Sequence, residues 1–224
     1  MAEALETVLW TFIRTDLSVA DFEAWLYTQD PMDELLGAVL AFDLMATDYR
    51  DRNAVYLIRQ RLEKRLRPML SCECVTLPDL ASVPMGADGR DGRVFATQEP
   101  IGEDSDRPWW LHAYRCKACG EAWLAAHEER IYDEYLFRRL SETEVRAVEQ
   151  GRWPDDFLTY ESVLKTCAKL GRPWRWDDPL AASLRYTVED LRAARPDISP
   201  EEIAACMGIE VDHARLLLSR IGLP

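Results

Sequence analysis

The chain has 224 residues, 27 of them basic and 40 acidic, which gives a net charge of −13, and 48% of its residues are apolar. These proportions are typical of a folded globular protein and exclude wholesale disorder. No apolar run reaches the roughly 18 residues of a membrane span, and no basic residue precedes Arg14. The N-terminus therefore lacks the basic start of an export signal, and we expect a cytoplasmic protein without membrane contact.

The first part of the chain, residues 1–70, is predicted to be a helical unit. Ser18 can cap one helix, with Asp21 three positions later. The proline of the Asp30–Pro31 pair favours a second helix start. A third helix is expected from about Asn53 to Pro68. The apolar face of the second helix is expected to contain Met32, Leu35, Leu36, Val39 and Leu40.

Residues 71–140 are predicted to form a zinc-ribbon-like β unit. An acidic loop rich in proline and glycine is expected over 78–108, because these residues interrupt regular structure. Short strands are expected at Val94–Ala96, Trp109–Tyr114 and Trp123–Ala126.

Residues 141–224 are predicted to form a helical C-terminal unit. Ser141 and Glu144 have the spacing of a capping box, and Asp155 or Asp156 begins another helix that Gly171 and Pro173 end. Thr187 is expected to open a short helix, and Ser199 a further one. The fold class is therefore α+β and mainly helical, with helical N-terminal and C-terminal parts around a small zinc-ribbon-like β centre.

Four cysteines in two close pairs predict a metal site. Cys72 and Cys74 form a CxC pair, and Cys116 and Cys119 form a CxxC pair followed by Gly120. Two thiolates from one tight turn can bind one ion, and two such turns complete a tetrahedral shell of four sulfurs around Zn²⁺. A closed shell of this kind leaves no position for substrate, so we expect structural zinc.

Three other interpretations of these cysteines stay open. The pairs are separated by 41 residues, so a disulfide or inert core thiols are alternatives, although a chain without an export signal favours reduced cysteines. His112 could replace one cysteine as a ligand, and is otherwise an ordinary strand histidine. Cys167 and Cys206 lie on apolar helical faces and are expected to be small buried side chains.

The segment 199–221 resembles a helix-turn-helix hairpin. Ala204 would let the helices approach, and Gly208 would take the turn. DNA reading requires a basic second helix, but this one offers Arg215 and Arg220 against Asp212. Direct nucleic-acid binding is therefore not expected. A zinc-ribbon nucleic-acid or transcription accessory factor that uses this hairpin is the alternative function.

Catalytic motifs are absent from the sequence. His127–Glu128–Glu129 is followed by no second histidine at the spacing of HExxH, and no GxSxG or phosphate-binding glycine loop occurs. We expect a protein that is not an enzyme, while a metal-stabilised enzyme of unknown chemistry is a third hypothesis.

Acidic residues are concentrated near the N-terminus and in the central loop. Residues 16–51 contain nine acidic side chains and one basic one, Arg50. A surface of this kind can serve solubility alone, or it can attract a basic protein partner. For the second function, the candidate partner-binding residues are Asp43, Asp48, Asp51, Glu103, Asp104 and Asp106.

Two stretches of the chain resemble known bacterial proteins. Asp21–Leu26, Leu35–Gly37 and Asp48–Tyr49 resemble the opening of small immunity-type proteins from contact-dependent and other polymorphic toxin systems. Residues 116–140 resemble a zinc-bearing extension of uncharacterised bacterial proteins. The resemblance covers about a third of the chain and implies a cytosolic inhibitor that binds and neutralises a basic toxin, often a nuclease. The long acidic insert and the C-terminal helices lie outside it.

Overall fold

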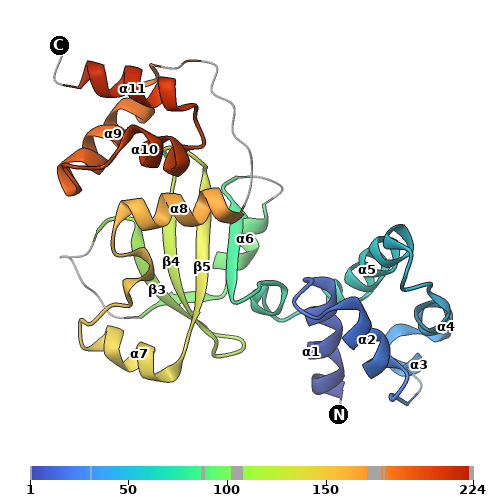
Figure 1. Ribbon diagram of the computed structural model, residues 1–224. Helices are drawn as coiled ribbons and strands as arrows, with labels where there is room; N and C mark the ends of the chain where they lie inside the picture. The colour runs from blue at the N-terminus through green and yellow to red at the C-terminus, as the bar shows by residue number, and fades with distance from the viewer. Residues whose placement is uncertain are drawn as a thin grey trace. The chain divides into compact units, whose positions relative to one another are not determined.

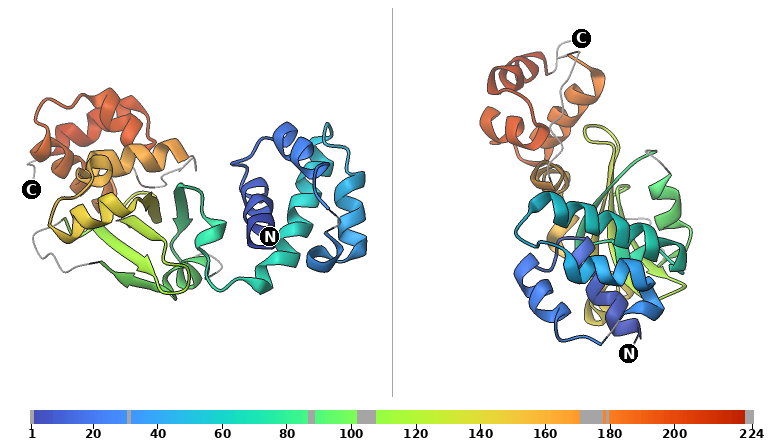
Figure 2. Two further views of the ribbon diagram at one scale, coloured as in Figure 1. Left: turned by 90° about the horizontal axis from the view of Figure 1, so that it is seen from below. Right: turned by 90° about the vertical axis from the view of Figure 1, so that its right-hand side faces the viewer.

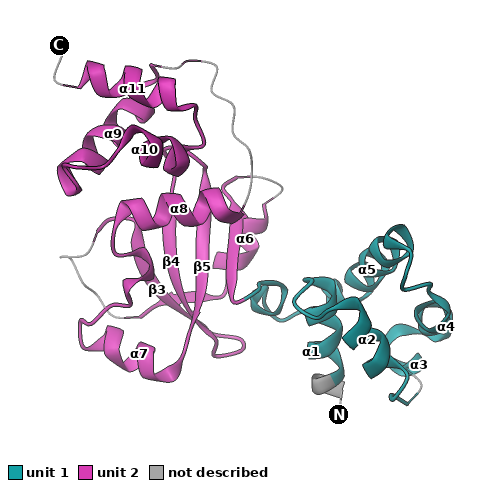
Figure 3. Cartoon of the chain, in the orientation of Figure 1, with its two compact units in different colours: residues 1–78 teal, residues 79–224 magenta. Residues whose placement is uncertain are grey.

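The computed structural model describes residues 2–30, 32–86, 89–101, 108–170, 178 and 180–221. The chain forms two compact units, Met1–Pro78 and Asp79–Pro224, each with its own apolar core (Figure 3). The protein is α+β and mainly helical, and in chain order a five-stranded antiparallel sheet lies between helical N-terminal and C-terminal parts, which confirms the predicted fold class. Among the described residues, no helix combines the length and apolarity of a membrane-spanning segment.

The N-terminal unit consists of helices and short 3₁₀ turns. The Oγ of Ser18 accepts a hydrogen bond from the Asp21 amide at 3.1 Å, so the predicted cap of α2 is confirmed. The longest helix of the unit begins after Asp51, and its buried side chains recur at helical spacing. The elements are α1 (Ala2–Ile13), α2 (Val19–Leu26), α3 (Asp33–Leu36), α4 (Ala38–Ala46), α5 (Arg52–Leu66), η1 (Arg67–Met69) and η2 (Cys74–Thr76).

The single helix predicted after Asp30 is wrong, because the chain forms two short helices there. Gly37, with φ +80°, ends α3 and precedes α4. This left-handed backbone redirects the chain at a residue without a Cβ. Val39, expected on the buried face, is consequently 74% exposed, while Ala41 and Leu44 are buried. Pro31 lies outside the described residues.

The C-terminal unit is built on a sheet with the strand order β1-β5-β4-β3-β2. The β3–β4 hairpin pairs Tyr114 with Trp123, and β4 pairs along its whole length with β5, a strand that the sequence analysis did not predict. The strands are β1 (Leu80–Pro84), β2 (Gln98–Pro100), β3 (Leu111–Cys116), β4 (Ala122–Glu128) and β5 (Glu134–Leu140).

The segment 78–108, predicted as a loop with little regular structure, contains β1, α6 (Arg90–Phe95) and β2. The strand expected at Val94–Ala96 is wrong, because Val94 and Phe95 end α6. A short apolar run does not itself distinguish helix from strand, and here tertiary packing decides. The Phe95 ring packs 4.8 Å from the ring of Tyr135 and 5.9 Å from that of His127.

Helices pack against both faces of the sheet. Helices α7 (Glu142–Glu149) and α8 (Tyr160–Leu170) lie on one face and bury the apolar side chains that β3, β4 and β5 direct to that face, and α6 lies on the other (Figures 1 and 2). The capping box of Ser141 and Glu144 at the start of α7 is confirmed. The 3₁₀ turn η3 (Asp155–Phe157) precedes α8. Residues from both predicted segments, 71–140 and 141–224, share this core.

The last three helices complete the unit, namely α9 (Ala182–Ala194), α10 (Pro200–Met207) and α11 (Val211–Arg220). The cap of Ser199 is confirmed, and Gly208 ends α10 in the left-handed region with φ +64°. Thr187 does not open a helix but is fully buried inside α9. Leu184, Val188 and Leu191 are buried at helical spacing on both sides of it, so the helix continues through this position. The predicted stops at Gly171 and Pro173 lie outside the described residues.

Candidate metal centre

The β3–β4 hairpin positions the second cysteine pair. Cys116 is the last residue of β3, and its amide donates a 2.8 Å hydrogen bond to the Glu121 carbonyl. The Gly120 amide donates a 2.9 Å hydrogen bond to the Cys116 carbonyl, and Gly120 has φ +79°. This tight reversal is the conformation that the glycine after the CxxC pair predicts. It brings Cys119 back beside Cys116.

The first cysteine pair lies in the turn that precedes β1. The Thr76 amide and hydroxyl both donate to the Glu73 carbonyl, at 2.9 Å and 2.8 Å. The Glu73 carboxylate accepts two hydrogen bonds from Arg67, at 2.8 Å and 2.9 Å. These bonds hold both sides of Cys74, so the CxC pair lies on a fixed turn.

The four predicted ligands come together. The sulfur atoms of Cys72, Cys74, Cys116 and Cys119 all lie within 4.8 Å of one another. A tetrahedral shell with Zn–S bonds of about 2.3 Å places its sulfurs about 3.8 Å apart, and the separations in this cluster do not exceed 4.8 Å. The cluster could hold a metal ion, and four thiols are a donor set that suits zinc.

Hydrogen bonds around Cys116 favour its thiolate form. Burial raises the pKa of this thiol, but hydrogen bonds from the Thr97 side chain and from the amides of Cys119 and Ala118 outweigh it, and the pKa falls to about 7. The Sγ of Cys116 lies 3.2 Å from the Thr97 Oγ1. Metal ligation requires the thiolate, so the local structure prepares this sulfur to bind an ion.

The remaining two cysteines lie elsewhere, in the core of the C-terminal unit. None of the six cysteines, all of which belong to the described part of the chain, forms a disulfide. Burial raises the pKa of Cys206 to about 11 and also raises that of Cys167. Both thiols are therefore protonated at neutral pH and pack as small apolar side chains.

His112 does not belong to the cysteine cluster but to an aromatic layer on the α6 face of the sheet. Its Nε2 lies 2.9 Å from the Trp109 carbonyl, and its ring centroid is 4.4 Å from that of His127. The His127 ring also packs against Tyr135 at 4.8 Å, and its buried Nε2 has no hydrogen-bond partner among the described residues. Burial, and secondarily the neighbouring His112, lower the pKa of His127 to about 4.

The depressed pKa of His127 predicts a loss of stability in mild acid. As the pH falls below about 6.5, His127 binds a proton in the unfolded chain before it does so in the folded one. The contribution of neutral His127 to the free energy of unfolding is therefore complete above about pH 6.5 and is lost between about pH 6.5 and pH 4. The full shift corresponds to about 3 kcal/mol, and partial exposure reduces it to about 1–2 kcal/mol. Urea unfolding at pH 7 and pH 4.5 should show this loss in the wild type and a smaller one in His127→Gln. The matched variant His213→Gln, on α11, should lose as much as the wild type, and equal losses in all three proteins would contradict the assignment.

The predicted partner-binding residues have local structural roles where the structure describes them. Asp43 forms a 2.5 Å ion pair with Arg61 of α5, Asp48 accepts from the Arg50 amide, and Asp51 caps α5 through the Asn53 amide. These three carboxylates lie on α4 and on the turn between α4 and α5, and their part in partner binding stays a prediction. Glu103, Asp104 and Asp106 lie outside the described residues.

Glu128, the last residue of β4, was not predicted from the sequence as a site residue. Its carboxylate is fully buried and accepts hydrogen bonds from the amides of Arg130 at 3.1 Å, Ile131 at 3.1 Å and Tyr132 at 2.5 Å. The Tyr160 hydroxyl of α8 donates to it at 2.5 Å. These hydrogen bonds use both carboxylate oxygens. Glu128 therefore has a structural role, because it holds the backbone of the β4–β5 turn in place. The Glu128–Glu129 pair at the end of an apolar strand gave no signal of this network.

Comparison of the chain with protein families, with curated proteins and with solved structures gives no match.

Proposed function

We propose that the protein is a zinc-stabilised, non-catalytic binding protein of the immunity type, which neutralises a basic protein partner. The observation that carries this proposal is the acidic surface of the N-terminal unit. Of the nine acidic side chains in residues 16–51, seven are exposed and two are partly exposed, and Arg50 is the one basic residue in that stretch. The resemblance of Asp21–Leu26, Leu35–Gly37 and Asp48–Tyr49 to immunity-type proteins supports the same function.

The charge distribution favours fast capture of a basic surface. Complementary charge raises association rates from about 10⁵–10⁶ M⁻¹s⁻¹ toward about 10⁸–10⁹ M⁻¹s⁻¹ at low salt. Speed of this kind suits an inhibitor that must bind a harmful protein before it acts. A structural zinc ion in the cysteine cluster would stabilise the scaffold without offering an open coordination position.

The experiment is affinity capture from the source organism with the full-length chain, at 50 mM and 300 mM NaCl, followed by co-expression with the captured protein. We expect one basic protein, at least tenfold weaker binding at the higher salt concentration, and protection of cell growth on co-expression. The test variant neutralises three exposed carboxylates, Asp30→Asn, Asp33→Asn and Glu34→Gln.

A matched control neutralises three exposed carboxylates of the C-terminal unit, Glu149→Gln, Asp197→Asn and Glu210→Gln. Binding should weaken in the test variant and stay unchanged in the control. Capture of no basic protein, or capture that salt does not weaken, would count against the proposed function.

The alternative function, nucleic-acid binding through the α10–α11 hairpin, has less support. The Arg215 guanidinium forms ion pairs with Asp212 at 2.8 Å and with Glu201 at 2.9 Å. These carboxylates compete with phosphate for the arginine, and phosphate contacts supply most of the affinity of such proteins for DNA. We therefore place a protein partner first.

A further inference from the structure

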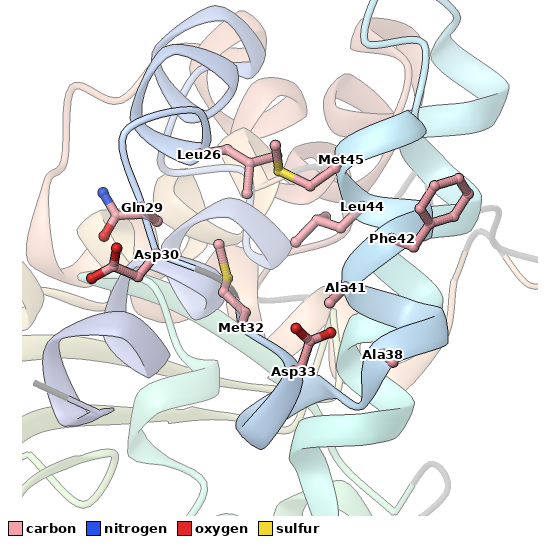
Figure 4. A pocket seen from close by; sticks show the side chains of 10 residues that line it. All are labelled: Leu26, Gln29, Asp30, Met32, Asp33, Ala38, Ala41, Phe42, Leu44 and Met45. Atoms are coloured by element: carbon pink, nitrogen blue, oxygen red, sulfur yellow. The ribbon is translucent and has the colours of Figure 1, made fainter.

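The N-terminal unit contains an apolar groove beside α4. Its volume is about 300 Å³, at the low end for ligand pockets and suited to one or two large side chains. Figure 4 shows the side chains of Leu26, Met32, Leu44 and Met45 converging on it. We call it the α4 groove, and its lining residues are Leu26, Gln29, Asp30, Met32, Asp33, Ala38, Ala41, Phe42, Leu44 and Met45.

Exposed apolar side chains of α4 extend the apolar surface of this groove. Val39 is 74% exposed, Phe42 71% and Met45 45%, and they follow one another at three-residue spacing along one side of the helix. The adjoining side of the helix is buried, because Ala41 and Leu44 belong to the core of the unit and also line the groove. Neighbouring exposed apolar side chains, next to a groove with an apolar floor, are typical of a protein interaction site.

Charge at the mouth of the groove selects the kind of partner. Asp30 and Asp33 line it and Glu34 adjoins it, and all three are exposed. The ion pairs of the described residues include none of these carboxylates. A second copy docked by two-fold symmetry would bring Asp30 and Asp33 against their own equivalents, and like charges in contact oppose binding. A partner that carries lysine or arginine beside large apolar side chains would match both the apolar groove and the acidic residues at its mouth.

We propose that the α4 groove binds a basic amphipathic helix of the partner. Large apolar side chains at positions i, i+3, i+4 and i+7 of that helix enter the groove and cover Val39 and Phe42, as in other helix-in-groove complexes. Its flanking lysines or arginines pair with Asp30 and Asp33. This inference rests on the proposed function, because it specifies where the basic partner binds and what part of the partner is recognised.

The test uses a fluorescein-labelled synthetic helix of 18 residues, with lysine and alanine as background and leucine or phenylalanine at the four apolar positions. Fluorescence anisotropy with the full-length chain should show binding at least tenfold tighter than to a peptide of the same composition whose apolar residues are scattered around the helix. Replacing its lysines by glutamate should abolish binding. Methyl NMR of the methionines should show shifts at Met32 and Met45.

The test variant is Val39→Ser combined with Phe42→Ser, and its control is Tyr56→Ser combined with Leu57→Ser, two residues of α5 that are also more than half exposed. Binding should weaken at least tenfold in the first and remain unchanged in the second. Equal binding of the ordered and scattered peptides, no binding at all, or no effect of the Val39/Phe42 variant would overturn the proposal. So would a concentration-dependent dimer in sedimentation that this variant abolishes, since a second copy would then cover the groove.

The two proposals fail separately. If the Val39/Phe42 variant captures the natural basic partner as well as the wild type does, the α4 groove is overturned and the proposed function stands. If the peptide binds in the groove but capture returns no basic protein, the proposed function fails and the groove remains a binding site for basic helices.

Discussion

Cys116→Ala is expected to abolish stoichiometric zinc binding and to lower the melting temperature by about 10 °C. Structural zinc in small peptides contributes about 10–16 kcal/mol of apparent binding energy, so one thiolate of four accounts for about 3–4 kcal/mol. In a chain of this size, 1 kcal/mol shifts Tm by about 2–4 °C. Elemental analysis of the purified protein and thermal unfolding with and without a chelator measure both effects.

The control for this prediction is Cys167→Ala, which removes a buried thiol outside the cluster. It should retain about one zinc per chain and lose only about 1 kcal/mol of stability. The chelator should destabilise the wild type and Cys167→Ala but leave Cys116→Ala almost unchanged. A Cys116 variant that keeps its zinc, or a wild type that is stable and metal-free, would contradict the metal site.

The cysteine cluster could be predicted from the sequence because the signal is local and chemically specific. A close pair of reduced cysteines in a tight turn is typical of a metal site, and Gly120 marks the reversal that the structure contains. Helix starts at Ser18, Ser141 and Ser199 could be predicted for the same reason, since a hydroxyl and an acidic residue at fixed spacing satisfy the free amides of the first turn.

One error occurs where tertiary contacts decide the structure, and another where a local break ends a helix. Phe95 ends a helix because its ring packs on Tyr135 and His127, which are distant in sequence. Helical periodicity predicted a buried Val39, but a glycine with positive φ breaks the helix two residues earlier. The α4 groove depends on that break and on how residues 26–30 and 32–33 pack beside α4, and helical periodicity does not predict that packing.

Glu128 shows how the sheet and the C-terminal helices depend on one carboxylate. Its hydrogen bonds to successive amides fix the β4–β5 turn, and Tyr132 of that turn donates its hydroxyl to the Cys206 carbonyl of α10 at 2.7 Å. Tyr160 connects the same carboxylate to α8. A fully buried charge without donors would be strongly destabilising, so this carboxylate and the turn are stable only together.

Glu128→Gln is expected to destabilise the protein by about 3 kcal/mol, the cost of leaving buried donors without an acceptor. Each carboxylate oxygen accepts from at least two groups, so the amide nitrogen of glutamine must face backbone N–H donors whichever way it is turned. Urea unfolding at pH 7 measures the loss. The neighbouring exposed residue provides the control, because Glu129→Gln makes the same charge change and should alter stability by less than about 0.5 kcal/mol.

Tyr160→Phe tests whether Tyr160 and Glu128 stabilise the protein together. In the wild type this substitution removes a hydrogen bond to a charged acceptor and should lower the free energy of unfolding by about 1.5 kcal/mol. In the Glu128→Gln background the acceptor is no longer charged, so the second substitution should cost less than half as much, giving a coupling of about 1 kcal/mol. Strictly additive effects would mean that Tyr160 and Glu128 stabilise the fold independently. Unchanged zinc content in all these variants would show that the metal cluster and the Glu128 network stabilise the protein through different parts of the chain.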